Sequence, residues 1–123
     1  MMLNPDVYQS YRTTPIKSIK DTEIEIVLRT TRRLKEHAET RQADYAGFVA
    51  ALSSNQKLWT MFAVDVANAN NGLTTDLRAQ IFYLFEFVQT YSRRVLIEDV
   101  SIAPLIETNL AMLRGLTAIR PSQ

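Results

Sequence analysis

Glycine and proline are scarce in this sequence, and their scarcity limits the folds that the chain can adopt. The 123 residues include only three glycines and four prolines. Because these residue types most often interrupt helices and strands, a chain with so few of them is expected to form long, continuous elements. Apolar residues recur at spacings of three and four through most of the chain, which is the period of an amphipathic helix, and no strand-like alternation stands out.

The sequence therefore predicts an all-α fold, a compact helical bundle of three to four main helices with a short N-terminal helix. The short helix is expected in NPDVYQSYR, where Asn4 can be the N-cap and Pro5 the first helical residue. The length favours a single domain covering residues 1–123. The longer helices are expected at residues 22–40, 43–68, 75–97 and 102–118.

Local signals suggest where these helices begin and break. Thr22 and Glu25 have the spacing of a capping box, and Thr74 is a good N-cap for the helix at 75–97. The segment SSN at residues 53–55 leaves open whether the helix at 43–68 is continuous, bent or divided.

Composition argues against most catalytic chemistry. There is no cysteine, so thiolate metal sites and a cysteine nucleophile are absent, and the one histidine, His37, is expected on a solvated surface. No phosphate-binding or dinucleotide fingerprint is present, and the carboxylates match no acid–base or metal motif. We therefore expect no enzyme activity, no metal and no cofactor.

The sequence has no stretch typical of a signal peptide or of a membrane-spanning helix. The N-terminus lacks the basic and apolar regions of a signal peptide, and the most apolar stretch, IFYLFEFV, is short and contains Glu86. A cytoplasmic protein without membrane insertion is expected.

A basic run in the helix at 22–40 raises the question of whether the protein binds nucleic acid. Acidic residues dilute it, no aromatic platform is interleaved with it, and the net charge of the chain is only +1. A solvated face is the main interpretation and direct RNA binding a minor alternative. The run comprises Arg29, Arg32, Arg33 and Lys35.

The helix at 75–97 carries more apolar surface than one buried stripe needs. Phe82, Phe85 and Phe87 lie off its main seam. Such a helix is expected either to be central and covered by several neighbours, or to be covered in part by a partner protein.

Three segments, taken together, resemble the FlaF family of flagellar biosynthesis regulators of α-proteobacteria. They are ALSSNQKLWTMFAVDVAN, NGLTTDLRAQIFYLFEFV and APLIETNLAMLRGL, and the early YQSY and the RRL at residues 32–34 also fit. The resemblance implies a non-enzymatic role in flagellum assembly, in which the protein binds unassembled flagellin as a secretion chaperone and promotes its production and export. It also implies a regulatory alternative, through FlbT, a negative regulator of flagellin translation, or through flagellin mRNA.

A groove between the helices at 43–68, 75–97 and 102–118 is the hypothesis for the flagellin site. Aromatic side chains would supply its hot spots, and polar ones would register the partner at its edge. The alternative for each residue is a structural role inside the bundle, and the oligomeric state is open. The apolar candidates are Trp59, Phe62, Phe82, Phe85, Leu105, Ile106 and Leu110, and the polar candidates are Asn55, Asp65, Arg78 and Asn109.

Overall fold

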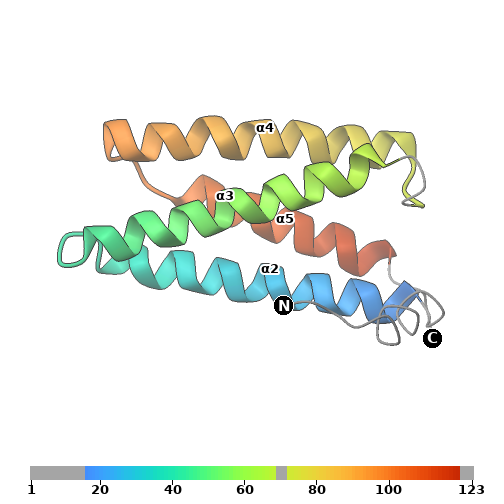
Figure 1. The fold of residues 1–123 in the computed structure, drawn as a ribbon, viewed down its shortest axis with the longest axis horizontal. Helices are drawn as coiled ribbons and strands as arrows, with labels where there is room; N and C mark the ends of the chain where they lie inside the picture. Colours follow the sequence, from blue (N-terminus) through green and yellow to red (C-terminus); the bar gives the residue numbers. More distant parts are fainter. Residues whose placement is uncertain (1–15, 69–71, 120–123) are drawn as a thin grey trace.

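The protein is described by a computed structural model over residues 16–68 and 72–119 (Figure 1). Within these residues every regular element is a helix and no strand occurs, which confirms the predicted all-α bundle. The short N-terminal helix predicted around Asn4 lies outside the described residues. The helices are α2 (Ile16–Glu39), α3 (Tyr45–Ala67), α4 (Thr75–Glu98) and α5 (Ala103–Ile119).

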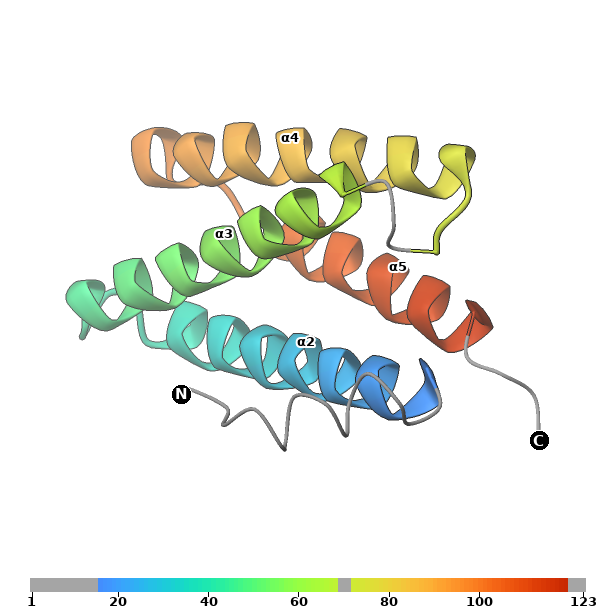
Figure 2. The same ribbon diagram turned by 45° about the vertical axis from the view of Figure 1, so that its right-hand side comes forward.

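The helices form an antiparallel bundle in which each one runs opposite to the helix before it (Figures 1 and 2). α3 packs against both α2 and α4, and α5 packs against the same two helices. Both views place α5 behind α3, so α3 and α5 lie on opposite sides of the bundle. Each face of the bundle therefore carries a different set of exposed side chains.

The start of α2 differs from the prediction. The helix begins at Ile16, directly after Pro15 in the sequence, so Thr22 and Glu25 lie inside it and do not form a capping box. No glycine or proline occurs between Ile16 and Thr22, and nothing in this segment opposes helix formation. Capping-box spacing marks a helix start only where the preceding residues cannot be helical.

α3 is one continuous helix that passes through Ser53, Ser54 and Asn55 without a break, so the bend or division left open at SSN does not occur. Its N-cap is Asp44, whose carboxylate accepts a 3.0 Å hydrogen bond from the backbone nitrogen of Gly47. This bond satisfies one of the amide groups that the first turn of a helix leaves without a backbone partner.

α4 has a defined residue at each end. The prediction of Thr74 as N-cap is confirmed, because its hydroxyl accepts a 3.1 Å hydrogen bond from the backbone nitrogen of Leu77. At the other end, Asp99 adopts the left-handed conformation with φ of 56° and donates its backbone N–H to the carbonyl of Val95. A left-handed residue at this position is a common way to end a helix.

Arg41 joins the α2–α3 connection to the end of α4. Its guanidinium lies 4.2 Å from the centre of the Phe48 ring and 2.7 Å from the Asp99 carboxylate. The same group donates to the backbone carbonyls of Val95 and Val100, at 3.5 Å each. A cation is favourable here because the C-terminal end of a helix carries unpaired carbonyl groups and partial negative charge.

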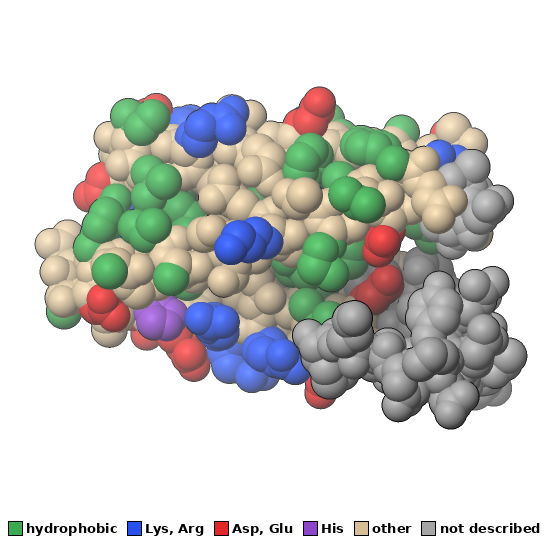
Figure 3. All heavy atoms as spheres, in the orientation of Figure 1, with side chains coloured by type: hydrophobic (Ala, Val, Ile, Leu, Met, Phe, Trp, Pro, Cys, Tyr) green, Lys and Arg blue, Asp and Glu red, His purple; other side chains and the backbone are tan. Residues whose placement is uncertain are grey.

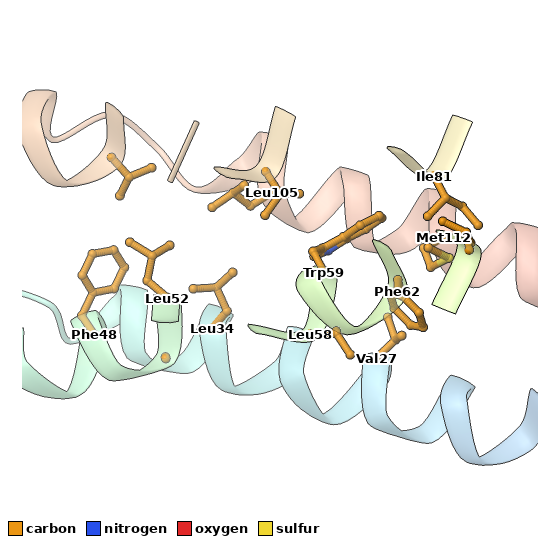
Figure 4. Packing of buried hydrophobic residues seen from close by; sticks show 14 residues of the cluster. Val27, Leu34, Phe48, Leu52, Leu58, Trp59, Phe62, Ile81, Leu105 and Met112 are labelled. Carbon is orange, nitrogen blue, oxygen red and sulfur yellow. The ribbon is translucent and has the colours of Figure 1, made fainter. Parts of the chain in front are cut away.

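α3 provides most of the core, and α4 provides less than predicted. Nine residues of α3 are buried, among them Phe48, Trp59 and Phe62 (Figure 4). α4 buries four residues, of which Ile81 is the first along the helix. The first of the two interpretations of the helix at 75–97, a central and fully covered helix, is therefore wrong. Its surplus of apolar residues points partly toward solvent.

Candidate partner-binding surface

Four of the residues predicted to contact a partner lie inside the bundle. Trp59, Leu105, Asn55 and Asn109 have no exposed surface, and Figure 4 shows Trp59 and Leu105 pointing into the packed interior. The helical stripe of α3 faces α2, α4 and α5 at once, so a large side chain at position 59 fills the space between them. In this conformation no partner can reach these four side chains. Their surroundings support the alternative interpretation, in which they stabilise the core.

The two buried asparagines and Trp59 are connected by hydrogen bonds. The indole nitrogen of Trp59 donates to Oδ1 of Asn109 at 2.8 Å. Nδ2 of Asn109 donates to Oδ1 of Asn55 at 2.7 Å and to the hydroxyl of Thr31 at 2.9 Å. Asn109 thus uses both amide hydrogens and its oxygen, and it links α5 to α2 and α3. Their polar groups are needed inside the bundle rather than at the edge of a groove.

Phe62 and Arg78 also have structural surroundings. Phe62 is 7% exposed and meets Trp59 edge to face, with 5.8 Å between the ring centres. Arg78 is half-buried, and its Nε donates a 2.9 Å hydrogen bond to the carbonyl of Val66. This bond satisfies an end carbonyl of α3 and ties the first turn of α4 to the last turn of α3. Asp65 is exposed on α3.

The remaining predicted residues retain accessible surface, but not as one groove. Phe82 is 39% exposed and Phe85 is half-buried, both on α4. On α5, Leu110 is 40% exposed and Ile106 is half-buried. α5 packs against α2 and α4 and lies behind α3, so exposed residues of α5 and of α3 belong to different faces of the bundle. The predicted three-helix groove is therefore filled by the core, and its accessible residues are divided between faces.

A set of exposed and half-buried apolar residues does occur where α3 and α4 lie side by side. Hydrogen bonds fix their antiparallel register, from Arg78 to the carbonyl of Val66 at one end and between Gln56 and Gln89 at 3.2 Å near the middle. This register brings the N-terminal half of α4 beside the C-terminal half of α3. We call the apolar surface there the α3–α4 strip, and it comprises Met61, Val64, Phe82 and Phe85.

The α3–α4 strip is strongly exposed for an apolar surface. Met61 is 55% and Val64 65% accessible, and Figure 3 shows hydrophobic side chains gathered over this half of α3 and α4. Met61 and Val64 were missed as candidates by sequence reasoning. The available signal was their position, since both fall off the buried stripe of α3 and are spaced three residues apart, on its outer face.

Exposed apolar residues also occur outside the α3–α4 strip. Tyr45, Leu96 and Ile97 are exposed at the opposite end of α3 and α4. His37 is half-buried rather than fully solvated, because it lies against Gly47 at the α2–α3 connection. The described residues contain no group of three side chains able to hold a metal ion. Nor does any helix in residues 16–68 and 72–119 have the length and apolar character needed to cross a membrane.

The sequence model of one protein family, described as Flagellar protein FlaF, matches residues 5–116. The chain belongs to the FlaF family. The match confirms the resemblance drawn from the three motifs and covers α2, α3 and α4 in full with most of α5. Searches of curated proteins and of solved structures found no match.

Membership of the FlaF family makes this a flagellar protein. Two of the segments that resemble the family contain the buried hydrogen-bond network, with Asn55 and Trp59 in ALSSNQKLWTMFAVDVAN and Asn109 in APLIETNLAMLRGL. These segments therefore contribute to how the bundle is held together.

Proposed function

We propose that this FlaF family member binds unassembled flagellin in the cytoplasm as a secretion chaperone, and so promotes flagellin production and export without catalysing a reaction. The observation that carries the proposal is the α3–α4 strip, in which Met61, Val64 and Phe82 leave apolar surface uncovered. Exposed apolar surface of this kind often marks a site for protein partners. Membership of a flagellar family supports a flagellar partner.

A helical bundle is suited to binding the terminal segments of unassembled flagellin. The terminal regions of flagellin are amphipathic segments that become ordered helices only in the filament, and when free they would expose apolar surface and associate prematurely. An amphipathic helix can lay its apolar face on an apolar surface of a folded partner, with contacts at every third or fourth residue. The spacing of Met61 and Val64 on α3 is suited to such contacts.

The proposal is tested by mixing the purified protein with its cognate flagellin under conditions in which flagellin stays soluble. Size-exclusion chromatography with light scattering should show a 1:1 or 2:2 complex, and calorimetry should give its dissociation constant. The free protein must be run alongside, because its own oligomeric state decides between these stoichiometries. Absence of a complex by both methods would rule out the chaperone function.

A matched pair of variants places the site. Val64→Asp puts a charge in the α3–α4 strip, at a side chain that is 65% exposed, and should weaken flagellin binding by at least about tenfold. Ile97→Asp makes the same chemical change at a side chain that is 81% exposed, at the far end of α4, and should leave binding unchanged. Circular dichroism must show that both variants fold. Equal binding by both would exclude the strip as the site.

The second candidate function is post-transcriptional regulation of flagellin synthesis through FlbT or flagellin mRNA. One observation favours it, namely that Arg29, Arg32 and Arg33 are exposed on α2 and form no ion pair with any residue that the structure describes. Binding to the flagellin leader RNA that weakens steeply with salt would support the RNA route. Binding to FlbT in the absence of flagellin would support the protein route.

A further inference from the structure

The outer face of α3 carries a cation next to the α3–α4 strip. Lys57, Met61 and Val64 follow one another at spacings of four and three, so they lie on the same side of the helix. All three are exposed. The distance along the axis from Lys57 to Val64 is about 10 Å, or two helical turns. A second helix lying along α3 would therefore meet the charge and the apolar residues together.

The neighbouring edge of α2 adds two more cations. The imidazole of His37 lies at the α2–α3 contact, since Nδ1 would be 3.0 Å from a Cβ placed on Gly47. Arg33 and Arg29 precede His37 by one and two turns and follow the same edge of α2, turning gradually toward solvent. Both are exposed, and Figure 3 shows the basic side chains of α2 on the same face of the molecule as the strip.

These three cations have no carboxylate partner within residues 16–68 and 72–119. No ion pair joins Arg29, Arg33 or Lys57 to another residue of the described chain. The whole chain has a net charge of only +1, so this positive surface is local and is not a consequence of a basic protein. We define the mixed face as the α3–α4 strip together with these three cations.

We propose that the mixed face docks an amphipathic helix that carries carboxylates along one flank. The apolar side of that helix contacts the strip at Met61, Val64 and Phe82. Its acidic flank lies against the cations at Arg29, Arg33 and Lys57. Charge complementarity of this kind fixes the direction in which a partner helix lies and raises its rate of association.

The chemistry of the face distinguishes this partner from a nucleic acid. A single strand of RNA is held by phosphate contacts combined with aromatic rings on which bases stack. On the outer face of α3 the side chains that follow Lys57 are instead Met61 and Val64, which offer apolar contact and no stacking surface. Phe82 on α4 is the one exposed ring of the mixed face. The proposal rests on the proposed function, because the acidic amphipathic helix is expected to be a segment of flagellin.

The test measures the affinity of the full-length protein for purified cognate flagellin at several salt concentrations. The double variant R29E/R33E should bind flagellin at least about tenfold more weakly at low salt than the unmodified protein, with a much flatter salt dependence. The matched control is R93E/R114E, which makes the same change in net charge at two exposed arginines of α4 and α5. The control should bind within about twofold of the unmodified protein.

The outcomes separate this inference from the proposed function. If the unmodified protein does not bind flagellin, both are overturned. If Val64→Asp abolishes binding but R29E/R33E binds like its control at every salt concentration, the chaperone function stands and the acidic flank is wrong. Loss of RNA binding alone in R29E/R33E, with flagellin binding intact, also overturns the inference. Loss of flagellin binding together with its salt dependence, in a variant whose circular dichroism is unchanged, supports it.

Discussion

The indole nitrogen of Trp59 donates a 2.8 Å hydrogen bond to Oδ1 of Asn109, and both side chains are fully buried. A buried polar group is costly unless it is paired, so this bond allows a tryptophan and an asparagine to occupy the same core. Asn109 extends the network to Asn55 and Thr31, which makes one amide the junction of three helices. The polar part of the core therefore specifies how α2, α3 and α5 fit together.

Asn109→Ala should lower the free energy of unfolding by about 3 kcal/mol, because it leaves the indole N–H of Trp59 and Oδ1 of Asn55 buried without partners and removes the bond that Thr31 accepts. Trp59→Phe removes one donor and some packing, and should cost about 2 kcal/mol. Urea unfolding followed by circular dichroism measures both.

The double variant shows whether the two residues act through their mutual bond. Its loss of stability should fall short of the sum of the single losses by about 1 kcal/mol, because the second substitution has no bond left to break. Additive losses would mean that the 2.8 Å contact contributes nothing and that each residue acts through packing alone.

Arg41 should contribute more to the stability of the fold than its ion-pair partner Asp99. Arg41→Ala removes the contact with the Phe48 ring and the donors to the end of α4, and should cost about 1–2 kcal/mol. Asp99→Asn removes only the carboxylate charge, at a side chain that is 74% exposed, and keeps a residue type that tolerates the left-handed conformation. It should change stability by less than about 0.5 kcal/mol.

Thermal unfolding of the two variants checks this ranking. A larger loss for Asp99→Asn than for Arg41→Ala would show that the exposed ion pair, rather than the ring and the helix end, stabilises the connection between α2 and α3.

The periodicity of the sequence was enough to predict the helices, because the buried stripe of each helix recurs at spacings of three and four. It could not show which apolar residues α4 leaves exposed. Phe82 and Ile81 are adjacent and both strongly apolar, yet Ile81 is 7% and Phe82 39% exposed, since the packing of α4 against α3 and α5 decides which one is covered. The sequence alone does not show how these helices pack.

The burial of the polar candidates also could not be predicted from the sequence. The groove hypothesis placed Asn109 at the edge of the site, with a structural role inside the bundle as the alternative. Its burial depends on partners from α2 and α3, 78 and 54 residues away in the sequence. Conversely, Met61 and Val64 were overlooked because their position off the buried stripe indicates only that they are exposed, and not that the surface around them on α4 is apolar.

Two glycines in helices should respond to the same substitution in opposite ways. A methyl group on Gly47 would overlap Oδ2 of Asp44 and lie 3.0 Å from Nδ1 of His37. Gly47→Ala therefore displaces the carboxylate that caps α3, and should lower stability by about 0.5–1 kcal/mol in spite of the higher helix propensity of alanine. Gly115 has open space around it, so Gly115→Ala should raise stability by about 0.5–1 kcal/mol.

The cause at Gly47 can be isolated in an Asp44→Ala background. There the cap is already lost, so adding Gly47→Ala should be neutral or stabilising. If Gly47→Ala costs the same with and without Asp44, the lost cap is not the reason, and the contact with His37 would account for the effect.

Substitution of Ser92 by alanine should not destabilise the protein, although substitution of a buried residue usually does. The Ser92 side chain is fully buried on α4, and its hydroxyl has no hydrogen-bond partner among the described residues. Ser92→Ala removes an unsatisfied polar atom and raises helix propensity, so stability should stay equal or rise by up to about 1 kcal/mol. Ser92→Gly, which also removes the hydroxyl but lowers helix propensity, is the matched control and should destabilise. A clear loss of stability in Ser92→Ala, measured by urea unfolding, would show that the hydroxyl is hydrogen-bonded in solution.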